Sequence, residues 1–225
     1  MEIEPVAVLH SPFKEKFGIP RQSGVVDDVI SEVRFLDGYR NPDFICGLEH
    51  FSHIWLIWGF SANKVQTNIQ AKVRPPRLGG NSSLGVFATR SPYRPNPLGL
   101  SCVKIESIDT RNMVIKVRGA DLLDGTPVFD IKPYIPYADS RPEAKGGFTD
   151  DTPWAELDVD VPEDVSRDIP ADILSALVQV LKQDPRPRYQ DDPERIYGLS
   201  FDSFNVRFKV SGSKVLVLEI SRSRI

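Results

Sequence analysis

Residues 73–100 read VRPPRLGGNSSLGVFATRSPYRPNPLGL, a stretch in which proline, glycine and arginine alternate. Proline fixes φ and lacks a backbone donor, and glycine permits conformations that other residues avoid, so no regular helix fits here. Residues 84–89 are apolar and predict a short buried strand between two shaped loops. The loops carry Arg74, Arg77, Arg90 and Arg94. Guanidinium groups match phosphate and carboxylate oxygens, which predicts a binding site; a long surface connection with solvated arginines is the alternative.

The charges of the chain are unevenly distributed around this stretch. Residues 50–105 contain no Asp or Glu but seven Lys and Arg, whereas residues 139–168 contain ten acids against three basic residues. The net charge of −3 argues against indiscriminate nucleic-acid binding. The asymmetry instead indicates a local positive surface that faces an anionic ligand.

Composition indicates a soluble globular protein. The 225 residues are 40% hydrophobic and 26% charged, and the 19 prolines favour strands and shaped loops over long helices. Cys46 and Cys102 have neither metal-ligand nor redox spacing, which is typical of reduced cysteines in the cytoplasm. The N-terminus lacks the pattern of a signal peptide, and the longest apolar run, residues 54–60, is too short to span a bilayer. We therefore expect a cytoplasmic protein without a membrane association.

The first part of the chain predicts a β-rich fold. We expect strands at residues 3–9, 101–107, 113–119 and 128–137, a fully buried strand at 54–60, and a strand or short helix at 25–35. Asp124-Gly125 indicates a turn. Six or more short strands with many turns favour a β-barrel or a β-sandwich up to about residue 140, followed by a boundary in the polar segment 140–152.

The last part of the chain predicts a small α+β domain. A helix should begin at Pro170 and bury Ile173, Leu174, Leu177 and Leu181. Residues 204–210 alternate apolar and polar side chains, which predicts a strand with one basic, solvated face. Residues 211–213 then form a turn into a strand at 215–220, which gives a hairpin.

Few motifs point to a reaction. The chain has neither a dinucleotide-binding glycine pattern nor a phosphate-binding loop of the Walker type. His50 and His53 lack a third metal ligand at a sensible spacing, so we expect them to pack or to hydrogen-bond, and we expect no metal site. Asp130 falls in an apolar strand, where it is either a structural cap or a catalytic carboxylate with a raised pKa.

Five segments of the first part of the chain carry a family resemblance: residues 11–22 (SPFKEKFGIPRQ), 47–55 (GLEHFSHIW), 74–81 (RPPRLGGN), 85–100 (GVFATRSPYRPNPLGL) and 121–134 (DLLDGTPVFDIKPY). With these segments the sequence resembles the TsaA/TrmO family of S-adenosylmethionine-dependent tRNA methyltransferases. Two tail motifs, 184–189 (DPRPRY) and 202–207 (DSFNVR), are similar to the longer bacterial members. The family implies a mainly β fold, with a single-sheeted β-barrel methyltransferase domain over residues 1–145 and a small α+β C-terminal domain over residues 155–225.

The resemblance also implies an activity and its partners. A methyl group would pass from S-adenosyl-L-methionine to N6 of threonylcarbamoyladenosine beside the anticodon of threonine tRNA. The partners would be the anticodon stem-loop and a second copy of the chain, with the cofactor near the subunit interface. The matched motifs place the cofactor against Pro20, Arg21, Gln22, Ser61, Ala62, Arg90, Leu100, Asp124, Gly125, Thr126 and Pro127.

The remaining expected roles concern proton transfer and tRNA binding. Because the N6 lone pair is delocalised into the carbamoyl group, loss of the N6 proton should help, and Asp130 is the candidate base with Tyr134 as a second candidate. The expected tRNA surface comprises Lys72, Arg74, Arg77, Arg94, Arg186, Arg188, Arg207 and Lys209. Two other readings remain open: a non-catalytic β-barrel module that binds RNA, and a small-molecule binder that controls other proteins.

Overall fold

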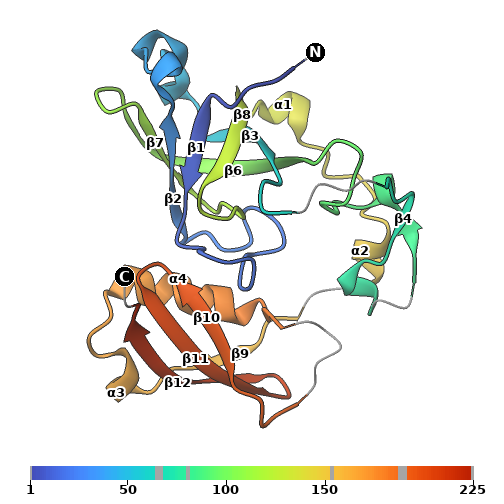
Figure 1. Cartoon of the computed structure of the whole chain (residues 1–225), viewed down its shortest axis with the longest axis vertical. Coiled ribbons are helices and arrows are strands. Elements are labelled where there is room, and N and C mark those ends of the chain that lie inside the picture. Colours follow the sequence, from blue (N-terminus) through green and yellow to red (C-terminus); the bar gives the residue numbers. More distant parts are fainter. Residues whose placement is uncertain (1, 64–67, 80–81, 153–154, 187–191, 224–225) are drawn as a thin grey trace.

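The first half of the chain forms a closed β-barrel. The computed structural model describes residues 2–63, 68–79, 82–152, 155–186 and 192–223. The barrel strands follow the order β1-β2-β7-β6-β3-β8, and every neighbouring pair is antiparallel (Figure 1). Their bounds are β1 Ala7–His10, β2 Ile30–Phe35, β3 His53–Gly59, β6 Leu98–Asp109, β7 Val114–Arg118 and β8 Thr126–Pro133. The mainly β barrel class is therefore confirmed, and the sandwich alternative is wrong.

Alternation along the strands builds the barrel core. In β3, Ile54, Leu56 and Trp58 are buried, whereas Trp55 and Ile57 are partly exposed. The expectation of a fully buried strand is wrong, because the strand presents one face to the barrel interior and the other outward. The alternation predicted for residues 113–119 is confirmed, since Met113, Ile115 and Val117 are all buried.

Strand boundaries differ from the expected ones at several positions. The first strand begins at Ala7 rather than at residue 3, and the segment 25–35 becomes a strand only from Ile30. The turn at residues 124–125 is confirmed, with Gly125 at φ +78° and the Thr126 amide donating to the Leu123 carbonyl over 3.2 Å. Short 3-10 helices occupy Asp37–Tyr39, Pro42–Ile45, Leu48–His50, Pro76–Leu78 and Val86–Ala88.

The segment between β3 and β6 leaves the barrel wall. It forms a small antiparallel pair, β4 (Lys72–Val73) with β5 (Leu84–Gly85), and not the buried strand expected at 84–89. Val86–Ala88 turns into a 3-10 helix instead, with the Thr89 hydroxyl donating to the Val86 carbonyl over 2.8 Å. Phe87 is 79% exposed. A two-residue partner strand cannot extend the pairing further, which explains why the apolar run is not a longer strand.

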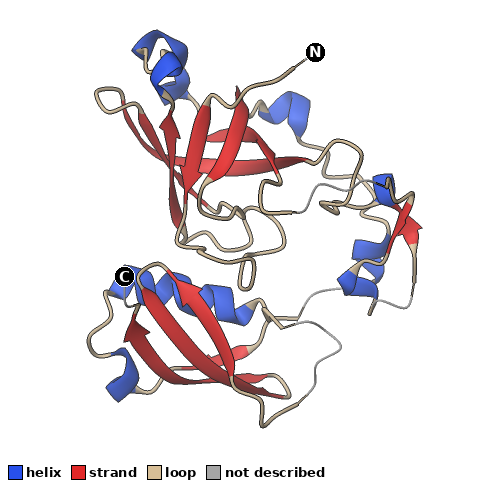
Figure 2. Ribbon diagram, viewed as in Figure 1, coloured by secondary structure: helices blue, strands red, loops and turns tan. Residues whose placement is uncertain are grey.

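The second half of the chain forms a four-stranded sheet covered by one helix. The strand order is β10-β11-β12-β9, in which β9 runs parallel to β12 and the other pairs are antiparallel (Figure 2). The elements are β9 Asp158–Asp160, α4 Ala171–Lys182, β10 Tyr197–Phe201, β11 Phe204–Ser211 and β12 Lys214–Arg222. The short helices are α1 Pro136–Asp139, α2 Phe148–Asp151 and α3 Glu163–Ser166. Among the described segments, none of the helices has both the length and the apolarity to cross a membrane.

The expected helix and hairpin of this half are confirmed. Helix α4 follows Pro170 and buries Leu177 and Leu181, together with Ala176 and Val180. Ile173 and Leu174, which we also expected to be buried, are partly exposed. In β11 the apolar residues are buried and the polar ones face outward, as the alternation predicted. The turn into β12 contains Gly212 at φ +57°, a conformation that glycine adopts without strain.

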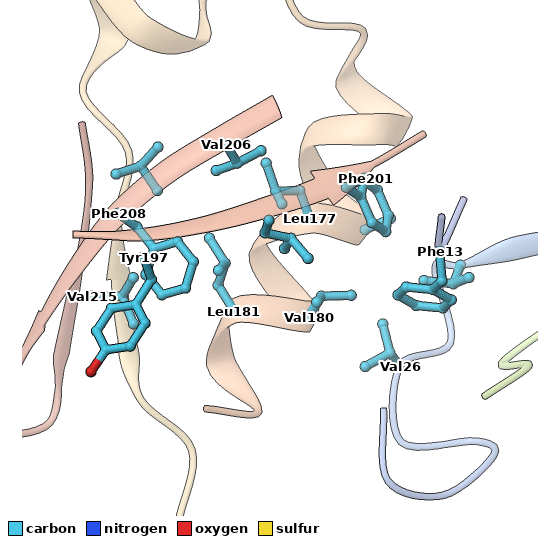
Figure 3. Packing of buried hydrophobic residues seen from close by; sticks show 14 of the residues in the cluster. Phe13, Val26, Leu177, Val180, Leu181, Tyr197, Phe201, Val206, Phe208 and Val215 are labelled. Carbon is cyan, nitrogen blue, oxygen red and sulfur yellow. The ribbon is translucent and has the colours of Figure 1, made fainter. Parts of the chain in front are cut away.

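The two halves meet through a shared hydrophobic core. Phe13, Val26 and Val29, which precede β2, pack into the cluster built by α4 and the second sheet (Figure 3). Phe13 and Phe201 contact edge to face with ring centroids 5.6 Å apart. The Asp202 amide donates to the Pro12 carbonyl over 2.7 Å. A division into domains at 1–145 and 155–225 stays a prediction, and residues 13–29 contribute to both halves.

Candidate active site

One end of the barrel opens into a cavity of about 460 Å³. The end of β3, the start of β6 and the start of β8 form its base, since Gly59 pairs with Leu98 and Trp58 with Gly99 in this part of the barrel. Loops from four other parts of the chain complete the wall. The lining residues are Lys16, Ile19, Pro20, Arg21, Gln22, Trp55, Trp58, Gly59, Phe60, Ser61, Ala62, Asn63, Arg90, Pro92, Arg94, Leu98, Gly99, Leu100, Asp121, Leu123 and Thr126.

The structure brings together most of the residues expected to contact a cofactor. Eight of the eleven line the cavity: Pro20, Arg21, Gln22, Ser61, Ala62, Arg90, Leu100 and Thr126. Asp124, Gly125 and Pro127 do not line it. The side chain of Asp124 instead accepts from the Ser11 amide over 3.0 Å and from Lys14 Nζ over 3.0 Å, and it lies 3.3 Å from His10 Nδ1. It fixes the chain before β2 rather than facing the cavity.

Arginine contacts join two of the loops around the cavity. Arg90 Nη1 donates to Gln22 Oε1, which ties the 89–94 loop to the 20–22 loop. Arg94 Nη2 donates to the Thr89 carbonyl over 3.1 Å, within its own loop. Arg94 therefore shapes the cavity wall, and its expected contact with tRNA stays a prediction.

At the base of the cavity, three side chains form a series of hydrogen bonds that the sequence did not reveal. Trp58 Nε1 donates to Ser101 Oγ over 2.9 Å, and Ser101 Oγ donates to Asp121 Oδ1 over 2.6 Å. Burial raises the pKa of the Asp121 carboxyl, against the opposing effects of the Ser101 hydroxyl and the Arg90 charge. The motif DLLDG contains two acids, and the structure turns the first toward the cavity and the second away from it. The spacing of the two acids in the sequence hinted at these opposite directions, because side chains three residues apart around a turn need not face the same way.

Asp130 lies farther along β8 and Tyr134 directly follows that strand, and both are outside the cavity lining. The Asp130 side chain is 49% exposed and pairs with Lys132 Nζ over 2.9 Å. The expected apolar surroundings of Asp130 are therefore wrong, because residues 130 and 132 share the outward face of the strand. Tyr134 packs against His53 and Trp55, with ring centroids 6.2 and 5.9 Å away. Their catalytic role stays a prediction.

The basic residues expected to bind tRNA do not gather in one place. Lys72 and Arg74 are exposed at β4, and Arg207 and Lys209 project from the outer face of β11, where they pair with Glu219 and Glu194 at 3.2 and 2.9 Å. Arg77 donates to the carbonyls of Thr149 and Thr152 over 3.0 and 2.6 Å, which holds the end of α2. Arg186 is buried beside Asp184 at 2.8 Å. Arg188 lies outside the described residues.

His50 and His53, which were considered as metal ligands from the sequence, each contact a neighbouring residue along the chain. His53 Nδ1 lies 2.9 Å from Ser52 Oγ, and His50 Nε2 lies 3.8 Å from Glu49. Across the described ranges, no group of three or more His, Cys, Asp or Glu could hold a metal ion.

Comparison with known proteins gives matches over nearly the whole chain. Residues 8–140 match the model of the tRNA-methyltransferase O N-terminal domain, and residues 156–223 match that of the TrmO C-terminal domain. A tRNA (adenine(37)-N6)-methyltransferase of Escherichia coli is 39% identical over 230 residues, which cover 97% of each chain. A putative S-adenosylmethionine-dependent methyltransferase of Pseudomonas aeruginosa is 38% identical over 213 residues, 92% of this chain and 91% of the relative.

A solved structure shows the same similarity. A crystal structure of TrmO from Pseudomonas aeruginosa superposes with a TM-score of 0.80 at 30% sequence identity, covering 98% of each chain. With both family models matched and similarity along the full length of these relatives, the chain belongs to the TrmO (tRNA-methyltransferase O) family.

Proposed function

We propose that this protein transfers a methyl group from S-adenosyl-L-methionine to N6 of threonylcarbamoyladenosine, beside the anticodon of threonine tRNA, in the cytoplasm. The family is one of tRNA (adenine(37)-N6)-methyltransferases by the names of its relatives. The observation that carries the proposal for this chain is the cavity at the barrel end, which gathers eight of the eleven expected cofactor contacts.

The chemistry of the cavity fits this methyl donor. Its volume of about 460 Å³ lies within the range of small-molecule sites, about 300–1,000 Å³. Trp58, Phe60 and Leu98 offer apolar surface for an adenine ring, and Arg90 offers a guanidinium group to a carboxylate. Trp58 and Phe60 pack edge to face with centroids 4.4 Å apart, so the aromatic wall is rigid. When bound, the donor supplies a methyl group that is already activated by its sulfonium centre.

The residues of the chain would therefore act by positioning. Arg90, fixed by Gln22, would hold the carboxylate end of the donor, and the Trp58–Phe60 wall would set the depth of the adenine ring. Alignment of two reactants can lower a barrier by roughly 7–11 kcal/mol. Asp130 does not line the cavity and pairs with Lys132, so its role in proton transfer stays a prediction apart from the positioning proposed here.

The tRNA would be held by exposed basic residues on the segment between β3 and β6 and on the second sheet. Lys72 and Arg74 are exposed, and Arg207 and Lys209 carry their charges on the outer face of β11. Such contacts position the phosphate backbone, whereas contacts with unstacked anticodon-loop bases specify the sequence. Arg77, Arg94 and Arg186 are engaged with protein groups, and we assign them to holding the loops.

Exposed apolar side chains near the cavity support a homodimer. Phe87 is 79% exposed, Leu100 at the cavity is 54% exposed, and Tyr93 is 46% exposed. These side chains come from the same loop-rich stretch, residues 86–100, and a second copy of the chain would cover them. Light scattering after size-exclusion chromatography tests this expectation, and a monomer at working concentration would contradict it.

A non-catalytic RNA-binding module is the second candidate, and donor binding separates the two. We expect calorimetric titration with S-adenosylmethionine to show saturable binding, and Arg90→Gln to weaken it about 10- to 100-fold through loss of a charge-assisted hydrogen bond. Phe44→Ala, which alters an exposed side chain outside the cavity, serves as the matched control. A protein that binds tRNA but no S-adenosylmethionine would exclude the methyltransferase and favour the RNA-binding module.

A further inference from the structure

The carboxyl group of Asp121 lies at the base of the cavity. It lies beside the barrel core and lines the cavity, so the surface that it still exposes faces the cavity. It is also the acidic member of the lining set, in which Lys16, Arg21, Arg90 and Arg94 are basic. Among the residues that the structure describes, no lysine, arginine or histidine forms an ion pair with it.

The position of this carboxyl group is fixed by its neighbours. Ser101 is 1% exposed and donates its hydroxyl to Asp121 Oδ1, and Ser101 in turn accepts from the indole of Trp58. The indole lies directly over Gly99, where a Cβ atom would come within 2.2 Å of the ring. Any side chain larger than glycine at position 99 would displace the ring. The glycine, the indole and the serine therefore hold the carboxylate in one place.

A carboxylate in such surroundings carries a free-energy cost that a cation can offset. Removal of an ion from water is unfavourable unless it gains an oppositely charged partner and hydrogen bonds. Arg90 lies close enough for its charge to act on Asp121, but its guanidinium group donates to Gln22. A ligand that carries both a carboxylate and an ammonium group would match the two residues together.

We propose that Asp121 binds the α-ammonium group of the methionine part of S-adenosylmethionine, opposite the carboxylate that Arg90 holds. This assignment rests on the proposed function, which supplies the ligand. An ammonium group donates up to three hydrogen bonds to a carboxylate, whereas a sulfonium centre donates none. The ammonium charge also persists through methyl transfer, so the interaction is equally strong before and during the reaction.

The sulfonium centre is a worse partner for Asp121. Its positive charge disappears as the methyl group leaves, and a carboxylate beside it would stabilise the bound donor more than the transition state. Such an arrangement would strengthen binding and slow the transfer. The aromatic wall of Trp58 and Phe60 provides a softer environment for the sulfonium, since ring faces attract cations without an opposite full charge.

The test measures by calorimetry how tightly each of three ligands binds to each of two proteins. The ligands are S-adenosylmethionine, S-adenosylhomocysteine, which keeps the ammonium but lacks the sulfonium charge, and the des-amino analogue of S-adenosylhomocysteine. The proteins are the wild type and Asp121→Asn, with Asp37→Asn, which alters a fully exposed acid outside the cavity, as control. Asp121→Asn should weaken the first two ligands by a similar factor, about 10- to 100-fold, and the des-amino analogue should bind both proteins alike.

Three outcomes would overturn the assignment. Loss confined to S-adenosylmethionine would place Asp121 beside the sulfonium. Loss of all three ligands would indicate a contact with adenine or a general role in cavity shape. Unchanged binding of all three would exclude a donor contact, and a reduced rate with unchanged binding would indicate proton transfer instead.

The wild type alone also decides the matter if Asp121→Asn folds poorly. Removal of the amino group from S-adenosylhomocysteine should weaken wild-type binding about 10- to 100-fold, and equal affinity for the two compounds contradicts the assignment. A wild type that binds neither S-adenosylmethionine nor S-adenosylhomocysteine would instead refute the proposed function itself. The two failures are therefore distinguishable.

Discussion

Phe13 offers a sharp test of how the two halves of the chain are joined. Its side chain is 0% exposed and contacts Phe201 edge to face at 5.6 Å, although it precedes β2 in the first half. The chain on either side is also anchored: the Asp124 amide donates to the Phe13 carbonyl over 2.9 Å, and the Asp202 amide to the Pro12 carbonyl. Phe13 therefore acts as a hydrophobic link between the barrel and the second sheet.

Truncation of this side chain should cost much of the stability. Phe→Ala in a buried site lowers the free energy of unfolding by about 3–5 kcal/mol, because apolar contacts are lost and a cavity remains. For a chain of this size, each kcal/mol shifts the melting temperature by about 2–4 °C, so Phe13→Ala should melt roughly 6–20 °C lower. Phe44→Ala, at a side chain that is 63% exposed, is the matched control and should change stability by less than about 0.5 kcal/mol.

Urea unfolding followed by circular dichroism measures both variants. Hydrogen exchange would add the location, since amides of β10 and β11 should exchange faster in Phe13→Ala than in the wild type. A loss below about 1 kcal/mol, or an equal loss in Phe44→Ala, would refute the view that residues near Phe13 join the two halves.

Three further predictions concern the cavity and the RNA surface. Burial raises the pKa of Asp121 above its ordinary value of 3.8, so its carboxylate form opposes folding. The contribution of Asp121 to stability is therefore greatest below that value and is lost as the pH rises through the raised pKa. The Arg90 charge opposes this rise in the Asp121 pKa. Ligand-free Asp121→Asn should therefore gain stability over the wild type as the pH rises through the raised pKa. A difference in melting temperature between the two proteins that stays constant from acid to neutral pH would contradict this. Gly99→Ala should displace the Trp58 ring and weaken S-adenosylmethionine binding, with an overpacking cost of about 1–3 kcal/mol; unchanged binding and stability would show that the ring has room to move. Replacement of Arg207 and Lys209 by Gln should weaken tRNA binding and reduce its salt dependence by up to about two units of slope, and an unchanged slope across a salt series would remove β11 from the RNA surface.

Periodic parts of the sequence predicted the structure well. The alternation from Phe204 to Val210 depends on one buried and one solvated face, and the sheet has both. The helix after Pro170 is likewise set by its apolar face and by a proline at its start. Such patterns are local and follow directly from the geometry of a strand or a helix. They predicted a mainly β fold and most of the element positions, whereas the choice of a barrel over a sandwich came from the family resemblance.

Motif resemblance predicted the site better than it predicted individual side chains. Arg90, Leu100 and the 20–22 segment do line the cavity, but Asp124 turns away while Asp121 faces in. The direction of each carboxylate depends on contacts with Ser11, Lys14 and Ser101, which lie far away in the sequence. A linear motif contains both acids and does not indicate which of them the fold turns inward.

The arginines illustrate the same limit. Their number predicted a positive surface, yet Arg77 donates to backbone carbonyls at the end of α2 and Arg94 to a carbonyl of its own loop. The partners become visible only when the chain is folded. Asp130 shows the reverse case, since an apolar stretch of sequence suggested burial, whereas its side chain lies on the outer face of the barrel beside Lys132.

The most direct test of the proposed function is mass spectrometry of tRNA nucleosides. Threonine tRNA that carries threonylcarbamoyladenosine would be incubated with the purified protein and S-adenosylmethionine bearing an isotopically labelled methyl group. We predict that the labelled methyl group appears on N6 of threonylcarbamoyladenosine, depends on the donor, and falls at least tenfold with Arg90→Gln at limiting donor. Threonylcarbamoyladenosine that stays unlabelled, in the presence of a protein that binds both the tRNA and the donor, would contradict the proposed reaction.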